Sequence, residues 1–318
     1  MKKVLITGGS GFVGTYLAQH LLDLGSSEIH GTYLTDESRE KSPVKEKITF
    51  HKVDLQNKEE TEKLIGSVMP DDVYHLAALS SVGASFKDPI GTFHSNIDVQ
   101  LNLFESLRKF DLLQSKVLVV GSAEEYGYVL PEDLPINESV SLRPASPYAV
   151  SKITQDFLGL QYAISYQMPI IRIRPFNHVG PGQGLGFVVA DFAHQIAKIE
   201  KGDIPPVIKV GNLSAKRDFT DVRDMVRLYP LLLEKGTPGE VYNAGSGKSR
   251  AIQEILDLLL QNATAKITVK VDPVRMRPSD VPEIVADSTK VRQVTGWKPT
   301  IPFEQTLKDT LDYWRQIV

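Results

Sequence analysis

The first half of the chain alternates between two hydrophobic patterns. Short runs rich in β-branched residues, as in buried strands, are separated by segments in which apolar residues return every three or four positions, as on a helix. Alternation of this kind is typical of parallel strands joined by right-handed helical crossovers. It predicts an α/β fold with a doubly wound parallel sheet, the Rossmann arrangement. The strand-like runs are residues 4–7, 28–33, 48–53, 72–76, 116–120 and 170–174, and the helical segments are 12–24, 58–66, 86–109 and 147–167.

After residue 175 the alternation weakens and proline and glycine become more frequent. Helices are expected near 187–200, 251–262 and 303–316, and the run at 241–243 is expected to return to the sheet as a further strand. We therefore expect residues 1–175, with that strand, to form the Rossmann domain. Residues 176–318 are expected to form mainly a smaller C-terminal lobe.

Composition narrows the class of protein. The formal net charge is −3 and 24% of the residues are charged. The protein therefore has no overall positive field that would attract nucleic acid or a membrane surface. No run reaches the roughly 18 apolar residues of a membrane helix, and the apolar run after the first lysines stops at Gly8, too early for a signal peptide. The chain has no cysteine, which excludes disulfides and thiolate nucleophiles. We expect a cytoplasmic protein that binds no nucleic acid, membrane or metal.

A glycine-rich segment lies between the first strand and the first helix. It reads Thr7-Gly8-Gly9-Ser10-Gly11-Phe12-Val13-Gly14. Glycines there permit a tight turn and let backbone N–H groups approach the phosphates of a dinucleotide at the positive end of the helix. Any tight strand-to-helix turn can carry glycines, but this context favours a cofactor pyrophosphate loop built on Gly8, Gly11 and Gly14.

A second group of residues offers acid–base chemistry. Tyr148 and Lys152 are four residues apart on a predicted helix, so the ammonium group can favour ionisation of the phenol, which can then exchange a proton with a carbinol oxygen. Ser122 follows the fifth strand, where it can hydrogen-bond the same carbonyl group. The alternatives are a solvated Tyr–Lys pair and a serine that only caps a turn.

The glycine loop, the serine and the Tyr-x-x-x-Lys pattern, in this order, resemble the extended short-chain dehydrogenase/reductase superfamily of nucleotide-sugar enzymes, from Lys2 to about Trp314. The resemblance implies that Ser122, Tyr148 and Lys152 are catalytic and that the cofactor is NADP(H), with NAD(H) also accepted. Other stretches that carry it are Asp54-Leu55, Leu76-Ala77-Ala78, Asn96, residues 122–127 and Arg174-Pro175-Phe176-Asn177. The cofactor-binding residues that it implies are Gly8, Gly11, Phe12, Val13, Gly14, Asp54, Leu55, Leu76, Ala77, Ala78, Asn96, Tyr148 and Lys152.

Within that superfamily, residues 176–183, 209–224 and 277–282 are similar to GDP-6-deoxy-D-mannose reductases. This implies a substrate-binding C-terminal lobe and reduction of the 4-keto group of GDP-4-dehydro-6-deoxy-D-mannose to GDP-6-deoxy-D-mannose, that is GDP-D-rhamnose. Arg217 and Arg277 could clamp phosphate or ribose, the alternative being surface ion pairs. His178 is assigned to positioning or structure. The expected substrate-binding residues are Ser122, Ala123, Glu124, Tyr148, Asn177, Arg217, Arg277 and Asp280.

Two other functions stay open. GDP-mannose 4,6-dehydratases carry a glutamate at the position of Glu124, where it acts as a base, so this residue does not separate a reductase from a dehydratase or a related epimerase. The stretch after Phe176 lacks the glutamate and paired arginines of the dehydratases. A catalytically silent, dinucleotide-sensing protein is the other alternative, although the complete Ser-Tyr-Lys set argues against it.

Cofactor preference and assembly depend on weaker signals. Tyr33 and Leu34 close the second strand without selecting NAD or NADP, while Asp36 and Arg39 favour opposite cofactors. We expect NADPH to be used and NADH to be tolerated. The resemblance also implies a homodimer through the helices at 86–109 and 147–167. Their apolar residues Leu101, Phe104, Leu107, Phe157 and Leu160 could equally pack on their own sheet.

Overall fold

The computed structural model describes residues 2–25, 27–275 and 281–318. Its centre is a seven-stranded sheet in the order β10-β6-β5-β4-β1-β2-β3, and every pairing in it is parallel. The prediction of a doubly wound parallel sheet is confirmed. The order reverses between β1 and β4, which is where such sheets bind ligands. The strands are β1 (Lys2–Thr7), β2 (Ser27–Tyr33), β3 (Thr49–Lys52), β4 (Asp72–His75), β5 (Lys116–Val120), β6 (Ile170–Pro175) and β10 (Val241–Ala244).

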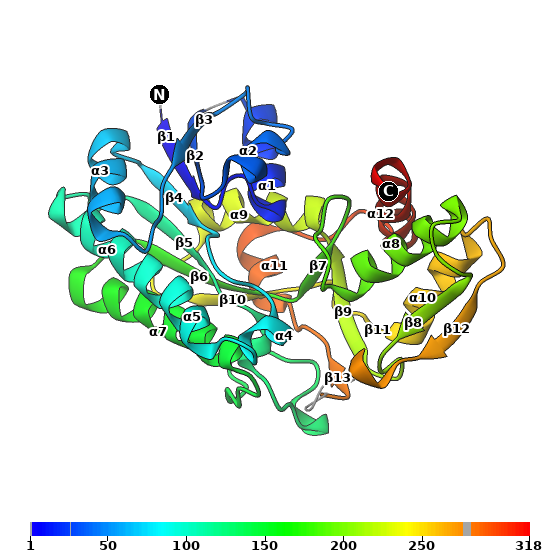
Figure 1. The fold of residues 1–318 in the computed structure, drawn as a ribbon. Coiled ribbons are helices and arrows are strands. Elements are labelled where there is room, and N and C mark those ends of the chain that lie inside the picture. The colour runs from blue at the N-terminus through cyan, green and yellow to red at the C-terminus, as the bar shows by residue number, and fades with distance from the viewer. Residues whose placement is uncertain (1, 26, 276–280) are drawn as a thin grey trace.

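Helices cover both faces of this sheet (Figure 1). Neighbouring side chains on one strand therefore enter different cores, as Leu5 and Ile6 of β1 do, and this explains the near-continuous apolar strands. On one face lie α1 (Phe12–Asp23), α9 (Val222–Lys235) and α11 (Thr289–Thr295). On the other face lie α3 (Lys58–Val68), α6 (Val99–Lys109) and α7 (Pro147–Tyr166).

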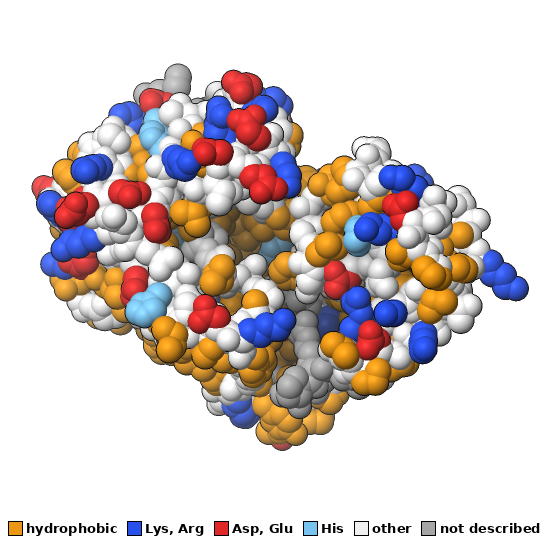
Figure 2. Space-filling view, viewed as in Figure 1, with side chains coloured by type: hydrophobic (Ala, Val, Ile, Leu, Met, Phe, Trp, Pro, Cys, Tyr) orange, Lys and Arg blue, Asp and Glu red, His pale blue; other side chains and the backbone are white. Residues whose placement is uncertain are grey.

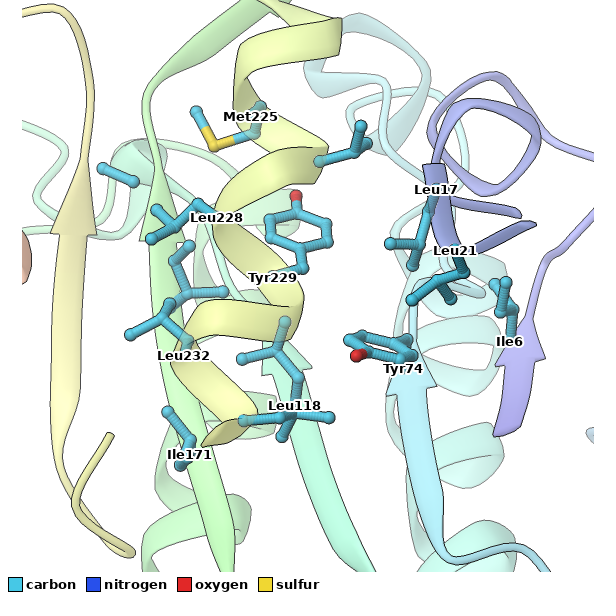
Figure 3. Packing of buried hydrophobic residues seen from close by; sticks show 14 of the residues in the cluster. Ile6, Leu17, Leu21, Tyr74, Leu118, Ile171, Met225, Leu228, Tyr229 and Leu232 are labelled. Carbon is cyan, nitrogen blue, oxygen red and sulfur yellow. The ribbon is translucent and has the colours of Figure 1, made fainter. Parts of the chain in front are cut away.

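The core on the first face joins distant parts of the chain. Figure 3 shows Leu17 and Leu21 of α1 beside α9, with both helices packed over the strands. Tyr229 of α9 is fully buried between them. Residues of the second half thus help to build the main body, and β10 pairs with β6 in the register Val241↔Arg172. The expected returning strand at 241–243 is confirmed.

The second lobe contains small sheets and three longer helices. In one sheet β9 pairs with β11, β13 and β7, and in another β8 pairs with β12. The strands are β7 (Asn177–Val179), β8 (Val207–Val210), β9 (Lys216–Asp221), β11 (Ser249–Ala251), β12 (Thr268–Val271) and β13 (Glu283–Ile284). The helices are α8 (Val188–Lys201), α10 (Ile252–Gln261) and α12 (Phe303–Ile317), whose apolar faces meet in a separate core.

The predicted helix over 86–109 is divided in the structure. It consists of α5 (Pro89–Phe93), a π-helical turn η1 (His94–Asp98) and α6. The turn carries Asn96, which is fully buried. Short helices α2 (Asp36–Glu40) and α4 (Val82–Ser85), together with the 3₁₀ turns η2 (Ala123–Glu125), η3 (Pro131–Asp133) and η4 (Pro273–Arg275), complete the secondary structure. Throughout the described residues, every helix is either too short or too polar to cross a bilayer.

Candidate active site

The glycine loop makes the tight turn that its sequence predicts. Gly8 has a φ of 70°, and the N–H of Gly11 donates to the Gly8 carbonyl at 3.0 Å. A Cβ atom on Gly14 would lie 2.3 Å from that carbonyl oxygen, so no larger residue fits there. Gly11 begins α1 without a side-chain cap. The first N–H groups of the helix are therefore available to an anion, and the loop fits the diphosphate of a dinucleotide.

The loop after β4 lies against the glycine loop. The Thr7 hydroxyl oxygen accepts the N–H groups of Leu76 at 3.0 Å and Ala77 at 3.1 Å. A Cβ atom on Gly8 would come within 3.2 Å of the Ala77 backbone. Three of the expected cofactor residues, Gly8, Leu76 and Ala77, are thus neighbours at the switch point of the sheet.

Asn96 fastens the same loop from its other end. Its side-chain oxygen accepts the N–H of Leu79 at 2.7 Å, and its amide nitrogen donates to the Ser151 hydroxyl on α7 at 2.9 Å. Asn96 therefore holds the loop onto the helix that carries Tyr148. The two cofactor-binding residues expected after β3 lie in different environments. Leu55 is buried in the core, whereas Asp54 is exposed.

Ser122 lies on the turn that follows β5. Its backbone N–H donates to Oε1 of Glu125 at 2.7 Å, and its hydroxyl oxygen accepts the N–H of Glu124 at 3.1 Å. A Cβ atom on Gly121 would lie 2.2 Å from Glu125 Oε1, so a larger residue there would displace this oxygen from its bond with the Ser122 N–H. We call residues 121–125 the catalytic turn, after the catalytic role that the sequence leads us to expect for Ser122.

Tyr148 is the second residue of α7 and meets the catalytic turn. Ser146 caps the helix by accepting the N–H of Ala149 at 3.1 Å. Burial raises the pKa of the Tyr148 phenol, and the hydrogen bond with Ser122 opposes this rise. The expectation that Lys152 lowers this pKa is not met, because the ammonium group is directed toward other acceptors. The buried phenol is protonated at neutral pH.

Lys152 lies one helical turn after Tyr148 and is almost fully buried. Its ammonium group donates to the Val120 carbonyl at 2.8 Å and to Oε1 of Gln155 at 2.8 Å. Burial lowers the pKa of Lys152 to about 8, while the charge of Glu125 acts in the opposite direction. Neither acceptor was anticipated from the sequence.

A buried ionic cluster supports the catalytic turn. Arg174 donates from Nε to Glu125 at 2.8 Å and also pairs with Asp156 of α7. Asp156 accepts a second bond from Arg172 at 2.8 Å. No local sequence pattern predicted that Glu125, Asp156 and Arg172 would share this cluster. The sequence does contain one signal for such a cluster. Arg172 and Arg174 alternate with isoleucines in a buried strand, and buried charges require partners of opposite charge.

On the side of the second lobe, His178 contacts the glycine loop. Its ring stacks on Phe12, with centroids 6.4 Å apart and planes within 7°. Nδ1 lies 3.2 Å from the Phe176 carbonyl, and burial lowers the pKa of the imidazole. These contacts agree with a positioning or structural role. Asn177 lies beside it in β7 and pairs with Phe219 of β9.

The remaining expected substrate residues divide into two groups. Ala123 is buried and Glu124 half-buried on the catalytic turn. Arg217 lies on β9, where Nη1 donates to the carbonyl groups of Lys216 at 2.8 Å and Val281 at 2.7 Å. Arg277 and Asp280 lie outside the described residues. Figure 2 shows the surface hollowed between the main body and the second lobe, with hydrophobic side chains in its depth.

Comparison with known proteins gives a consistent family. The model of the family described as GDP-mannose 4,6 dehydratase matches residues 5–310. The GDP-6-deoxy-D-mannose reductase of Pseudomonas aeruginosa is 34% identical over 317 residues, which cover 100% of this chain and 98% of that protein. A GDP-mannose 4,6-dehydratase of Yersinia enterocolitica is 28% identical and aligns with 96% of this chain and 91% of its own length.

Solved structures agree with this result. The structure of RMD from Pseudomonas aeruginosa complexed with NADPH superposes with a TM-score of 0.86 at 33% identity and covers both chains completely. The UDP-glucose 4-epimerase of Thermus thermophilus in complex with NAD has a TM-score of 0.87 at 29% identity, covering 99% of this chain and 100% of that one.

Proposed function

We propose that this chain, which belongs to the GDP-mannose 4,6-dehydratase family, is an NAD(P)H-dependent reductase. Its substrate would be GDP-4-dehydro-6-deoxy-D-mannose, and its product GDP-6-deoxy-D-mannose, or GDP-D-rhamnose. The observation that carries the proposal is the burial of Tyr148 where α7 meets the turn that carries Ser122, with Lys152 one turn farther along α7. The higher identity to the reductase, 34% against 28% for the dehydratase, supports this reaction over dehydration.

In the proposed reaction a bound nicotinamide cofactor would supply the hydride that is added to C4 of the sugar. Tyr148 would donate the proton to the oxygen that becomes the new hydroxyl group. Burial favours this role, because it keeps the phenol protonated and able to donate. Ser122 would orient the carbonyl oxygen, and the backbone bond to Glu125 fixes the turn that carries it.

The cofactor would lie along the loops at the carboxyl ends of β1, β4 and β5. The glycine loop would hold the diphosphate, and Lys152 and Tyr148 would contact the nicotinamide ribose. Asn96 would act indirectly, because its side chain is bonded to Leu79 and Ser151. The proposed cofactor-binding residues remain Gly8, Gly11, Phe12, Val13, Gly14, Asp54, Leu55, Leu76, Ala77, Ala78, Asn96, Tyr148 and Lys152.

We propose NADPH as the main cofactor, with NADH accepted. Asp36 would repel a 2′-phosphate, but it is paired with Lys52 at 2.5 Å, which offsets its charge. Arg39 pairs with Glu40 at 2.7 Å on the surface and would exchange this weak exposed pair for the phosphate. The balance of charge at the end of β2 therefore supports NADPH.

The GDP-sugar would bind between the catalytic turn and the second lobe. Glu124, half-buried beside Ser122, would contact a sugar hydroxyl group, and Arg217 with Arg277 would hold phosphate or ribose. The full proposed set is Ser122, Ala123, Glu124, Tyr148, Asn177, Arg217, Arg277 and Asp280. We place the enzyme in the cytoplasm, where a chain without cysteine needs no oxidising compartment.

A homodimer would form through α7 and its neighbour α5. Val150, Phe157 and Ile164 recur every seven residues along α7 and are 38%, 50% and 69% exposed. Ile90 of α5 is 71% exposed. Phe104 and Leu107, in contrast, are fully buried within their own subunit and cannot contribute to such an interface. The stripe on α7 is the feature that supports a symmetric contact.

One experiment separates the candidate functions. The purified protein is incubated with GDP-4-dehydro-6-deoxy-D-mannose and NADPH, and separately with GDP-mannose and NADP⁺, and the products are identified by NMR. We expect NADPH consumption and a 6-deoxy sugar with a hydroxyl group at C4. Conversion of GDP-mannose to the 4-keto sugar would instead identify a dehydratase, and NADPH binding without turnover of either sugar a sensing protein.

A further inference from the structure

Gln155 lies in a buried chain of hydrogen-bonding groups behind Lys152. Its Oε1 accepts from the Lys152 ammonium at 2.8 Å, and its Nε2 lies 3.4 Å from Nε2 of His75. His75 Nδ1 lies 2.9 Å from the Thr7 hydroxyl oxygen. All four side chains are at least nine-tenths buried. This series of hydrogen-bonding side chains connects Lys152 on α7 to the carboxyl ends of β1 and β4.

The protons of this chain can be assigned from its fixed donors. The Thr7 oxygen already accepts two backbone N–H groups, from Leu76 and Ala77. Its own O–H must therefore donate, and the acceptor is Nδ1 of His75. Burial lowers the pKa of His75 to about 3, so the ring is neutral and its single proton is on Nε2. This N–H points at the Gln155 amide.

The Gln155 amide consequently faces two donors with one oxygen. In the observed orientation the oxygen accepts from Lys152, and an amide nitrogen faces the His75 N–H. In the reverse orientation the Gln155 oxygen would accept the His75 N–H, and the amide nitrogen would lie against the Lys152 ammonium group. Either orientation leaves one donor without its acceptor, because an amide group carries only one oxygen.

We infer that Gln155 and His75 are positioning residues, which compete for a single amide oxygen and so limit how strongly the charged form of Lys152 is held. The inference rests on the proposed function, in which the Lys152 ammonium contacts the cofactor ribose. Weaker retention of the charge makes proton release from Lys152 easier, in the same direction as the burial that lowers the pKa of this group.

Other charged groups near Lys152 do not replace this effect. Glu125 raises the pKa of Lys152, and it is itself engaged by Arg174 and the Ser122 N–H. Asp156, one residue beyond Gln155, is taken up by Arg172 and Arg174. The titratable groups that interact with Lys152 are Glu125 on the catalytic turn and His75 on β4, and beyond Glu125 lies the cluster of Asp156 on α7 with Arg172 and Arg174 on β6.

Two substitutions test the inference in the full-length protein. Gln155→Glu supplies two oxygens, one for each donor, and should raise the pKa of Lys152 by about 1–3 units, as an adjacent opposite charge does. His75→Asn keeps an acceptor for Thr7 and removes the competing N–H, so it should raise the same pKa by less. Gln167→Glu, which places the charge on an exposed residue after the last turn of α7, should leave it unchanged.

The pKa of Lys152 is measured by ¹³C NMR of protein labelled at lysine Cε, with Lys152→Met identifying the resonance. The alkaline limb of the kcat/KM profile should move upward with this pKa in both variants. A pKa that stays in place or falls in Gln155→Glu and in His75→Asn would overturn the inference, since a purely structural role predicts lower melting temperatures without a directed shift. If the resonance shifts as expected but the wild-type protein reduces no keto sugar, the positioning role stands and the proposed function fails.

Discussion

The Nε atom of Arg174 lies 2.8 Å from Oε2 of Glu125, in a position sealed from solvent. The other oxygen of this carboxylate accepts the N–H of Ser122 at 2.7 Å. Burial and the nearby Asp156 raise the pKa of Glu125, and the charge of Arg174 opposes this rise and favours the carboxylate. The ion pair and the catalytic turn therefore form one unit.

Glu125→Gln keeps the shape of this side chain but directs an amide N–H toward the donors of Arg174. We expect a loss of about 1–3 kcal/mol in the free energy of unfolding, measured by urea denaturation. Turnover should fall while NADPH affinity is retained, because the change disturbs Ser122 and not the glycine loop. Glu132→Gln, at an exposed position, is the control. Unaltered stability and turnover in Glu125→Gln would refute the structural link.

Tyr148→Phe removes the proposed proton donor and keeps the ring that packs against the catalytic turn. Turnover of the keto sugar should decrease by roughly 10²–10⁴, the usual contribution of general acid–base catalysis. NADPH should still bind, as judged by calorimetry. Tyr128→Phe, on an exposed tyrosine, should behave as wild type. Near-wild-type reduction by the Tyr148 variant would exclude the catalytic assignment.

Arg217→Ala removes a cation from the proposed GDP-sugar site. The KM for the sugar nucleotide should rise, because a charge-assisted hydrogen bond is worth about 1.5–3 kcal/mol, and NADPH affinity should stay nearly constant. Arg277→Ala is expected to act in the same way. Lys248→Ala removes an exposed cation from the same lobe and serves as the control. Equal weakening of NADPH binding would place these arginines in a different pocket.

His75 makes the protein sensitive to acid. Its pKa falls from 6.5 to about 3 on folding, because burial disfavours the charged ring. The unfolded chain binds a proton below pH 6.5 that the folded chain excludes, so stability is lost as pH falls, by about 1.4 kcal/mol per unit. Between pH 7 and 5, urea unfolding of His75→Asn should lose about 2 kcal/mol less than wild type. Parallel losses in the two proteins would contradict this assignment.

Phe157→Glu tests the proposed dimer. A charge in the middle of the exposed stripe on α7 should separate the subunits, since its burial in an apolar contact is unfavourable. Light scattering at micromolar concentration should give about twice the chain mass of 35.3 kDa for wild type and the single mass for the variant. Leu24→Glu, at an equally exposed apolar residue of the main body, should stay dimeric. A wild-type monomer with full activity would end the dimer proposal.

The local pattern of apolar residues was sufficient to predict the strands of the main sheet, but it was not sufficient to predict helix α9. The strands are short apolar runs with turns on both sides, and the early helices repeat apolar residues at helical spacing. Helix α9 was not predicted, although Met225, Tyr229 and Leu232 have this spacing. It contains Pro230, and proline is unfavourable in the interior of a helix. Its first residues also belong to the stretch 209–224 that resembles the reductases.

The candidate site divides in the same way. Tyr148 and Lys152 are related by one helical turn, and Ser122 by its place after a strand, so their grouping could be predicted. The direction of the Lys152 ammonium could not be predicted, because it depends on tertiary contacts with two acceptors, the Val120 carbonyl and the Gln155 side chain. The Arg174–Glu125 pair joins residues 49 positions apart, and no local rule connects them.

Strand β10 completes the main sheet with residues that follow the first part of the second lobe, β7, α8, β8 and β9, in sequence. During synthesis the edge of β6 therefore stays bare until about residue 244 has left the ribosome, and α9, which covers one face of the sheet, emerges only shortly before. A fragment ending at residue 175 would expose both an unpaired strand edge and the apolar face beneath α9. Residues 1–175 alone therefore complete neither the main sheet nor the core on its first face.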